Sequence, residues 1–482
     1  MFDLSERTLL EPRSYIDGVW VEADKTFPVV NPATGETLAE VADLGRPETV
    51  AAISAAAKAQ KAWAARTAKE RTAVLRRWYD LVMAHQEDLA RLITAEMGKP
   101  LAEARGEIAY GASFIEWFAE EAKRIYGETI PGHQADKRLV VIKQPIGVVG
   151  AITPWNFPSA MITRKVAPAL AVGCAVVIKP AEQTPLSATA LAVLAEKAGM
   201  PPGVLNVITA REGQAVGQEL CTNDTVRKIT FTGSTEVGRI LMRQSADQIK
   251  KLSLELGGNA PFIVFDDADL DAAVEGAMLC KFRNAGQTCV CANRLYVQRG
   301  VYDAFAEKLS AAVAKLKVGD GFEDGITTGP LIDAQGLAKV EEHLSDATAK
   351  GASVMTGGAR HEKGGTFFQP TILTGVTQAM LVAREETFGP MAPLFAFEDE
   401  AEVIAMANAT EFGLAGYFYA RDLGRVWRVA EALEYGIVGI NTGIISTEVA
   451  PFGGIKHSGL GREGSRHGVE DFLEIKYLCM GV

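Results

Sequence analysis

Short apolar runs separated by helical stretches constrain the fold of this chain more than any other feature of its sequence. Such runs, rich in Val and Ile and poor in polar residues, are typical of strands buried on both faces of a sheet. One segment between them begins with Thr184-Pro185, a hydroxyl cap before a proline, and ends at Gly199. Buried strands separated by helices predict an α/β fold with a doubly wound parallel sheet. The runs are VVGAIT (148–153), CAVVIK (174–179), VLNVIT (204–209) and KITFT (228–232).

The chain of 482 residues is too long for one ordinary hydrophobic core, so it predicts two α/β domains and an arm. Residues 47–126 repeat apolar positions every three or four residues and predict helices. A second α/β series starts near Gly257-Gly258, and DFLEIKYLCM predicts a strand that pairs outside its own domain. The predicted units are a first domain (1–123 and 148–256), a second domain (257–448) and an arm (124–147 and 449–482).

The net charge of −11 argues against nucleic acid or an anionic membrane as the main partner, because both bind basic surfaces. The N-terminal segment MFDLSERTLLEPRSYIDG contains acidic residues and no continuous apolar stretch, so it does not resemble a signal peptide. The apolar region around 139–152 is interrupted by polar residues and glycine and is too short to span a bilayer. We expect a soluble, cytoplasmic protein.

Six cysteines and six histidines are scattered along the chain and predict neither a disulfide framework nor a metal site. The cysteines are expected to be reduced, so a special role for any of them depends on thiol reactivity. Cys289 lies in the polar, glycine-containing segment FRNAGQTC, where a thiolate would be accessible at a cleft. An ordinary buried cysteine fits the same segment.

Three further segments carry candidate groups at the ends of predicted strands. Glu255 ends LSLEL before two glycines, where burial would raise its pKa and suit general-base chemistry, but a glutamate facing water also fits. Asn156, in TPWNFP, offers an N–H donor of the kind that holds an oxyanion, and a plain turn fits as well. Gly233 and Ser234 join a strand to a helix in a geometry that can bind phosphate, without the G-x-G-x-x-G pattern.

Seven segments, in this order, resemble the aldehyde dehydrogenase superfamily over nearly the whole chain. They are ITPWNFP, IKPAEQTP, FTGSTEVG, LELGGNAPFIV, GQTC, EETFGP and PFGGIKHSG. The resemblance implies an oxidoreductase with a Rossmann-like dinucleotide-binding domain, a second α/β catalytic domain and a β-arm for oligomerisation. The family forms dimers or dimers of dimers, so a homodimer or homotetramer is expected.

The resemblance also implies a division of catalytic roles. Cys289 would attack the aldehyde carbonyl, and the oxyanion would be held by the Asn156 side chain and the Cys289 backbone N–H. Loss of hydride to the nicotinamide would leave a thioester, which water activated by Glu255 would hydrolyse. A soft sulfur suits both steps, and splitting the reaction in two lowers each barrier.

The positions that match the family's cofactor site predict which dinucleotide is bound. By resemblance, Lys179 and Glu182 would face the adenosine ribose. A carboxylate accepts hydrogen bonds from both ribose hydroxyls but repels a 2′-phosphate, so we expect NAD to be preferred, with NADP possible because of Lys179. The matching residues are Trp155, Lys179, Glu182, Gly233, Ser234, Leu256 and Glu386.

The predicted substrate is a small semialdehyde. Arg164, Arg283 and Ser446 match positions that bind the substrate carboxylate in succinate-semialdehyde dehydrogenases, the subfamily that the chain resembles most. Two arginines beside one pocket favour an anionic substrate, whereas each arginine alone fits a surface salt bridge. Glutarate semialdehyde is one methylene longer, a difference of only about 1–3 kcal/mol, and stays an alternative.

Cys291 lies two positions after the expected nucleophile. The resemblance to mitochondrial members of the subfamily suggests a disulfide with Cys289 as a redox switch, while a structural role is the simpler interpretation. Three other functions stay open: a non-catalytic homologue, an acylating dehydrogenase that uses coenzyme A or phosphate, and a cysteine hydrolase. The presence of Cys289, Glu255 and Asn156 together favours the hydrolytic dehydrogenase.

Overall fold

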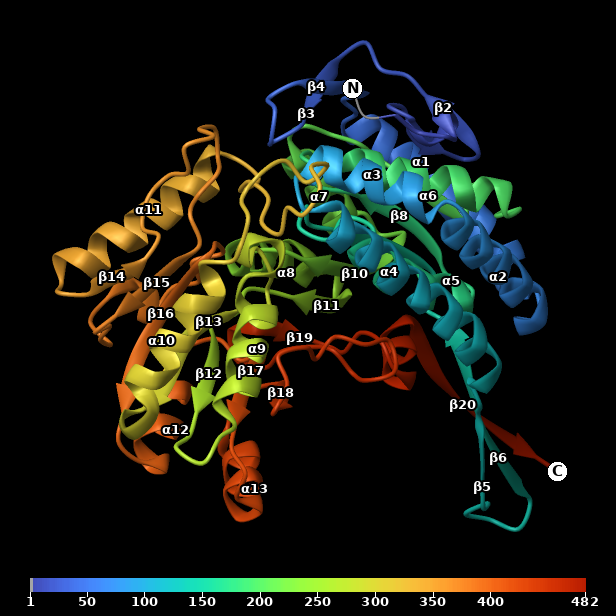
Figure 1. Cartoon of the computed structure of the whole chain (residues 1–482). Coiled ribbons are helices and arrows are strands. Elements are labelled where there is room, and N and C mark those ends of the chain that lie inside the picture. Colours follow the sequence, from blue (N-terminus) through green and yellow to red (C-terminus); the bar gives the residue numbers. More distant parts are fainter. Residues whose placement is uncertain (1–2) are drawn as a thin grey trace.

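The computed structural model describes residues 3–482 and contains two large sheets, a smaller three-stranded sheet and a two-stranded ribbon (Figure 1). The first large sheet has the strand order β19-β11-β10-β7-β8-β9-β1-β2. Its central strands are all parallel and are connected by helices, which confirms the doubly wound sheet. These strands are β7 (Val148–Ile152), β8 (Ala175–Lys179), β9 (Leu205–Val207), β10 (Val226–Thr232) and β11 (Lys251–Glu255), and the helices are α5 (Ala160–Val172), α6 (Pro185–Lys197), α7 (Gly213–Thr222) and α8 (Thr235–Ser245).

Both edges of this sheet are closed by antiparallel strands from the ends of the chain. The hairpin β1 (Ser14–Ile16) and β2 (Val19–Val21) joins at β9. On the other edge β19 (Gly459–Leu460) pairs with β11. The sequence analysis assigned all of residues 449–482 to the arm. In the structure, β19 instead belongs to the first large sheet. Gly459 makes this pairing possible, because a Cβ there would lie 1.7 Å from the Leu254 carbonyl oxygen.

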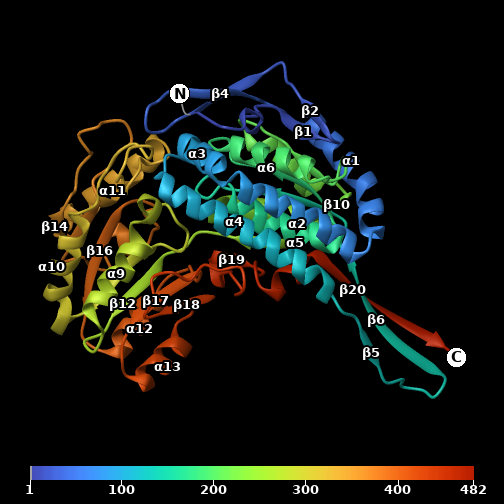
Figure 2. The same cartoon turned by 45° about the vertical axis from the view of Figure 1, so that its right-hand side comes forward.

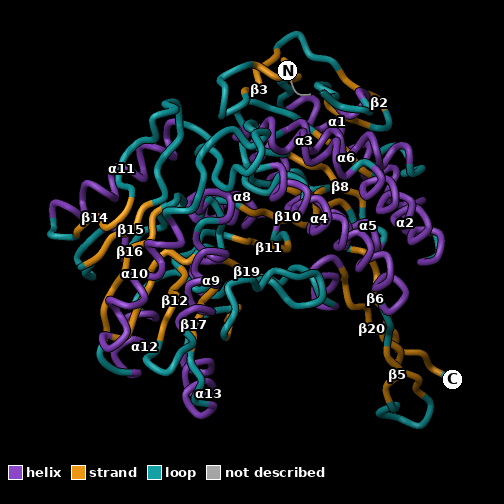
Figure 3. The backbone as a smooth tube through the Cα atoms, in the orientation of Figure 1, coloured by secondary structure: helices purple, strands orange, loops and turns teal. Residues whose placement is uncertain are grey.

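The predicted helical region 47–126 forms four helices (Figure 3). They are α1 (Arg46–Ala65), α2 (Ala68–Ala84), α3 (Gln86–Met97) and α4 (Leu101–Glu121). The first of them contacts β8 and α7, whereas the other three pack against α5 and α6. Thr67 starts α2 with a capping box to Glu70, and Gly98, in the left-handed conformation, ends α3. The buried Trp63 indole N–H donates to the Leu170 carbonyl at 3.0 Å and fixes α1 against α5. Regular α-helix ends at Glu121, slightly before the predicted limit.

The second large sheet has the order β14-β15-β16-β13-β12-β17-β18 and takes its strands from residues 260–440. A boundary at Gly257-Gly258 agrees with the strands, since β11 lies in the first sheet and β12 in the second. The strands are β12 (Ala260–Val264), β13 (Ala292–Gln298), β14 (Ser353–Thr356), β15 (Thr371–Thr374), β16 (Met391–Phe397), β17 (Ala415–Tyr419) and β18 (Ile437–Ile440); the helices are α9 (Leu270–Lys281), α10 (Tyr302–Val313), α11 (Ala334–Ala349), α12 (Glu400–Asn408) and α13 (Leu423–Ala432).

An arm projects from the body of the molecule (Figure 2). It consists of β5 (Glu128–Ile130), β6 (Lys137–Pro145) and the C-terminal β20 (Leu473–Gly481), with β20 antiparallel to β6 along its whole length. The strand predicted in DFLEIKYLCM thus pairs with a segment more than 300 residues earlier in the chain. The ribbon β3 (Thr26–Val30) and β4 (Thr37–Ala42) lies at the opposite end. Within residues 3–482, no helix is both long and apolar enough to cross a membrane.

Candidate active site

The parallel topology brings the ends of four strands to one edge of the first sheet. The register pairs Ile152 with Phe231 and Thr232 with Glu255, so β7, β10 and β11 end at nearly the same level. Asn156 follows β7 and Gly233 follows β10, while Lys179 is the last residue of β8. In open α/β sheets this carboxyl edge is where ligands bind. Candidates from Asn156 to Glu255, which are far apart in the sequence, therefore lie along one crevice.

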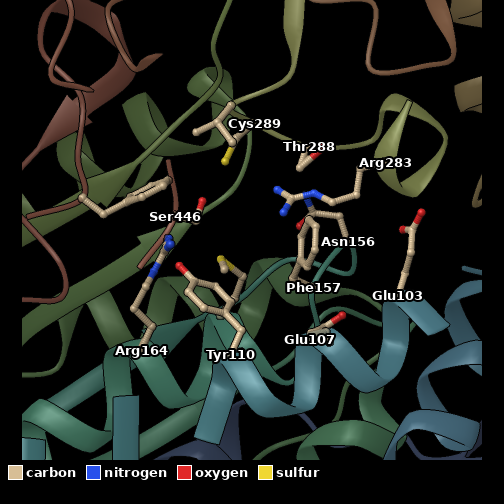
Figure 4. A pocket seen from close by; sticks show the side chains of 14 residues that line it. Glu103, Glu107, Tyr110, Asn156, Phe157, Arg164, Arg283, Thr288, Cys289 and Ser446 are labelled. Carbon is tan, nitrogen blue, oxygen red and sulfur yellow. The ribbon is translucent and has the colours of Figure 1, made fainter. Parts of the chain in front are cut away.

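A cavity of about 280 Å³ lies between this edge and the loop that carries Cys289 (Figure 4). Cys289 is on one side, and Arg164 and Tyr110 project from α5 and α4 on the other. The volume is below the range typical of sites for drug-sized ligands, so it fits a substrate of a few carbon atoms. The cavity brings together five predicted residues: Cys289, Asn156, Arg164, Arg283 and Ser446.

Cys289 is held by an unusual loop between α9 and β13. Asn284, Ala285 and Gly286 have φ values of 53°, 53° and 76°, so three successive residues adopt the left-handed region. Such backbone strain is tolerated where the surroundings determine the conformation, often at functional sites. Burial raises the pKa of the Cys289 thiol to about 12. The resting thiol is therefore protonated at neutral pH, and its attack on a substrate requires a base.

Asn156 is buried, and hydrogen bonds hold both its side-chain amide and its backbone carbonyl. Its side-chain Nδ2 donates to the Gln287 carbonyl at 3.0 Å, and its own carbonyl accepts from Lys99 Nζ at 2.7 Å. The amide has two N–H groups and this contact uses one of them, so the other remains to face the cavity that Asn156 lines. The arrangement is suited to stabilising an oxyanion formed beside Cys289.

Glu255 ends β11 and is buried. Among the described residues, neither carboxylate oxygen has a hydrogen-bond partner. Burial, reinforced by the nearby charge of Glu463, raises the pKa of Glu255 well above its ordinary value. A Cβ at Gly453 would lie 2.9 Å from Glu255 Oε1, so glycine leaves room for this carboxylate. A buried carboxylate without partners is poorly explained by stability and is suited to proton transfer.

The two predicted substrate arginines have different surroundings. Arg164 is 1% exposed, forms an ion pair with Glu463 and stacks on the Phe452 ring at 4.2 Å. Its Nη2 has no hydrogen-bond partner in the described part of the chain. The Arg283 guanidinium lies 5.4 Å from the Phe157 ring, and no carboxylate among residues 3–482 forms a salt bridge with it. Both side chains line the cavity, so the alternative of surface salt bridges does not describe them.

A groove of about 600 Å³ along the sheet edge contains five of the predicted cofactor residues: Trp155, Lys179, Glu182, Gly233 and Ser234. Ser234 caps α8 by accepting from the Val237 N–H at 3.3 Å, so the start of this helix faces the groove. Lys179 Nζ and Glu182 Oε2 are 3.0 Å apart, and the Glu182 side chain is 42% exposed. The residues that could hold a dinucleotide therefore line this groove.

The remaining two cofactor candidates, Glu386 and Leu256, are not among the described residues that line this groove. Glu386 lines an adjoining cavity that shares Trp155 and Ser234, and burial raises its pKa to about 8. Leu256 lies behind the groove, where a Cβ at Gly238 would be 2.5 Å from its Cδ2 atom, and its backbone N–H donates to the Ser458 carbonyl at 2.9 Å. Leu256 packs α8 against the sheet and is not among the groove-lining residues within 3–482.

Cys291 and Cys289 have different environments. Cys289 is half-buried in the cavity wall, whereas Cys291 is buried and its Sγ accepts from Lys281 Nζ at 3.5 Å. Burial raises the pKa of Cys291. The predicted switch stays a prediction, and it requires the loop to turn Cys291 away from Lys281.

Sequence reasoning missed a group on the side of α4 that faces the site. Glu103, Glu107 and Tyr110 line the cavity, and Lys99 lies just before the helix. The spacing i, i+4, i+7 was the available signal, because it puts these polar residues on one helical face together with buried apolar ones. The Tyr110 hydroxyl is buried without a hydrogen-bond partner among residues 3–482 and points into the cavity.

The parallel sheet, the groove at its carboxyl edge and the cavity beside Cys289 are the arrangement expected of a nucleotide-dependent α/β enzyme. Residues 20–478 match the aldehyde dehydrogenase family, and the chain belongs to this family. It is 69% identical over 480 residues to the glutarate-semialdehyde dehydrogenase of Pseudomonas aeruginosa, with 99% of each chain covered. It is 68% identical to the NADP(+) succinate-semialdehyde dehydrogenase of Escherichia coli, over 99% of this chain and all of the relative. A crystal structure of an E. coli NADP-dependent enzyme superposes with a TM-score of 0.99 at 67% identity, covering both chains completely.

Proposed function

We propose that this aldehyde dehydrogenase oxidises succinic semialdehyde to succinate, with glutarate semialdehyde as the alternative substrate. The observation that carries the proposal is a small cavity with Cys289 on one side and two arginines, Arg164 and Arg283, in its wall. A guanidinium cannot discharge, so a pocket with two of them favours an anionic group at the far end of the substrate. The relatives named for succinate and glutarate semialdehyde support the same substrate class.

In the proposed reaction, the Cys289 sulfur forms a bond to the aldehyde carbon and the carbonyl oxygen becomes an oxyanion beside Asn156. A bound nicotinamide cofactor would supply the acceptor for the hydride that leaves this carbon. The carbonyl reforms as a thioester on Cys289. Glu255 then removes a proton from water, whose oxygen attacks the thioester carbon, and the carbon–sulfur bond breaks to release the acid and the thiol. We also assign to Glu255 the removal of the thiol proton, because it is a buried carboxylate with no hydrogen-bond partner among the described residues.

A panel of aldehydes of increasing length tests the substrate assignment. We expect kcat/KM to be largest for succinic semialdehyde, lower for glutarate semialdehyde and lowest for uncharged aldehydes of the same lengths. One methylene changes the ratio by only about 10- to 200-fold, so both semialdehydes should react measurably. A higher kcat/KM for glutarate semialdehyde would favour the alternative, and equal values for charged and uncharged aldehydes would exclude the anionic pocket.

Replacing Arg283 with alanine should raise the KM for succinic semialdehyde about 10- to 100-fold, because one charge-assisted hydrogen bond to the carboxylate is lost. The KM for butanal, which has the same carbon chain and no carboxylate, should stay within about threefold. Initial rates at saturating cofactor measure both. Arg360→Ala, which removes an exposed ion pair with Glu341, is the control. An Arg283→Ala enzyme with the wild-type KM for the semialdehyde would rule out the proposed carboxylate site.

We also propose that NAD is preferred over NADP. Glu182 forms an ion pair with the buried Lys179 and presents a partly exposed carboxylate at the groove. A carboxylate there repels a 2′-phosphate and accepts hydrogen bonds from two ribose hydroxyls. The E. coli relative is named for NADP(+), and Lys179 offers a cation that attracts phosphate, so the ratio of the two cofactors decides the proposal.

Replacing Glu182 with glutamine should raise the ratio of kcat/KM for NADP to that for NAD about tenfold or more. The substitution removes the repulsion and leaves Lys179 free to pair with the 2′-phosphate. The measurement is initial rates with each cofactor at saturating semialdehyde, and Glu362→Gln, on an exposed loop, is the control. A wild-type enzyme that already prefers NADP, or a ratio that Glu182→Gln leaves unchanged, would contradict the assignment.

We further propose that the arm mediates self-association into a dimer or tetramer. Ile475, Tyr477 and Met480 of β20 are exposed apolar side chains at 73%, 54% and 46%. Exposed apolar side chains concentrated on one edge strand are typical of an interface.

A further inference from the structure

A buried charged network lies behind Asn156, and no step of the proposed reaction uses it. Lys99 Nζ donates to Glu107 Oε2 at 2.6 Å and to the Asn156 carbonyl at 2.7 Å. The side chains of Lys99 and Glu107 are both 0% exposed. We propose that Lys99 is a positioning residue: supported by Glu107, it holds the Asn156 amide where the oxyanion forms. This inference rests on the oxyanion role proposed for Asn156.

Stability explains this ion pair poorly. Removing two charges from water is costly, and a buried pair is often no more stabilising than apolar side chains of the same size. The third donor direction of Lys99 is covered by the Phe157 ring, whose centroid is 3.8 Å from Nζ. The pair therefore sits directly under Asn156 and Phe157, two neighbouring residues that both line the cavity. The position of the network is better explained if it fixes the orientation of Asn156 and Phe157 in the cavity wall.

The network restrains the backbone of the oxyanion turn from several sides. The Asn156 carbonyl accepts a second hydrogen bond from Asn284 Nδ2 at 3.1 Å. Glu107 Oε1 accepts from the backbone N–H groups of Ser159 at 2.9 Å and Ala160 at 3.3 Å, at the start of α5. With the carbonyl of Asn156 and the following turn both held, its side-chain amide has little freedom to move.

The same helix holds the loop that carries the nucleophile. Glu103, one turn before Glu107 on α4, accepts from the Asn284 N–H at 2.8 Å. Asn284 is one of the residues with positive φ in the loop before Cys289. Carboxylates spaced i, i+4 on one helix thus bind the Asn156 turn of the first domain and the Cys289 loop of the second. By binding both segments, α4 fixes the distance between the Asn156 side chain and the Cys289 thiol.

Lys99 is not among the described residues that line the cavity, and it acts on the reaction only through Asn156. The cavity is lined by Glu103, Glu107 and Tyr110 of α4, whereas the Lys99 ammonium lies beneath Asn156 and Phe157. Burial lowers the pKa of Lys99, and the adjacent Glu107 opposes this effect. A residue that acts only on the position of Asn156 should change the rate of the chemical step and leave substrate and cofactor binding nearly unchanged.

The test is a double-mutant cycle with Lys99→Met and Asn156→Ala. We expect Lys99→Met to lower kcat about 30- to 100-fold, because a displacement of about 1 Å at a catalytic group has an effect of this size. The KM for succinic semialdehyde and the dissociation constant of NAD should change less than threefold. In the Asn156→Ala background, Lys99→Met should lower kcat by no more than about twofold. Full additivity of the two effects would overturn the inference.

Alkylation of Cys289 by iodoacetamide separates positioning from general disruption of the site. This reaction forms no oxyanion, so its rate should be the same in Lys99→Met and wild type. A parallel loss of alkylation and of kcat would assign Lys99 a merely structural role. If Lys99→Met does not fold, Lys99→Met with Glu107→Leu removes both charges; a folded double variant with wild-type kcat would also overturn the inference.

The outcome for Asn156→Ala alone distinguishes the two proposals. If this variant keeps wild-type kcat, the oxyanion role fails and the inference about Lys99 fails with it. If kcat falls strongly in Asn156→Ala but stays unchanged in Lys99→Met, the proposed reaction stands and only the positioning role is wrong.

Discussion

Replacing Cys289 with alanine will lower kcat for semialdehyde oxidation by at least about 10⁴-fold, because removal of a catalytic nucleophile leaves only binding and electrostatic effects. Binding of NAD should be unchanged, since the cofactor groove is formed by other residues. Steady-state rates and fluorescence titration of the cofactor measure the two quantities. A variant that retains more than about one per cent of the activity would show that another group is the nucleophile.

Cys291→Ala is the matched control, because Cys291 is a cysteine two positions away on the same loop. Its kcat should stay within about threefold of wild type, since the Cys291 thiol contacts Lys281 and is buried behind the cavity wall. The same variant tests the redox switch. If peroxide inactivation and its reversal by dithiothreitol are unchanged in Cys291→Ala, then a Cys289–Cys291 disulfide is not responsible for them.

Replacing Glu255 with glutamine should lower steady-state kcat about 10²- to 10⁴-fold, the range that a general base contributes. Hydrolysis of the thioester should be affected most, so mass spectrometry after mixing with succinic semialdehyde and NAD should detect an acyl group on Cys289. Rapid mixing should also show a burst of reduced cofactor that approaches one equivalent per site. Glu362→Gln on the surface should behave as wild type. Rapid turnover by Glu255→Gln with no acyl-enzyme would contradict the role.

The raised pKa of Glu255 gives the direction of the pH dependence. Only the deprotonated carboxylate acts as a base, so kcat should fall as the pH drops through the pKa of Glu255. Because burial raises this pKa, the fall should occur at a higher pH than for an ordinary glutamate. The acidic limb should be absent in Glu255→Gln. An activity that stays constant down to the ordinary range of a glutamate would contradict the raised pKa.

The chain sequence by itself determined the α/β fold class and the edge of the sheet where the chemistry lies. Buried strands are nearly continuous apolar runs, and the carboxyl ends of parallel strands line the ligand crevice, so the position of Asn156 after a predicted strand indicated a place beside the site. The segment around Cys289 did not by itself identify a nucleophile, because an ordinary buried cysteine fits the same local sequence. The ordered motifs that resemble the aldehyde dehydrogenase family made Cys289 the candidate nucleophile. The comparison confirms the family.

Only the tertiary structure decided which charges are buried and what they contact. Lys99 and Asn156 are 57 residues apart, and Arg164 pairs with Glu463 at the other end of the chain. The pairing of β19 with β11 was likewise missed, because it depends on the space beside Gly459 and not on any local pattern. Hydrophobic periodicity depends on neighbours along one element, whereas burial, pKa and orientation depend on atoms from distant elements. The sequence therefore predicted the candidate reacting groups, and the packing of α4 against both domains determines how they are held.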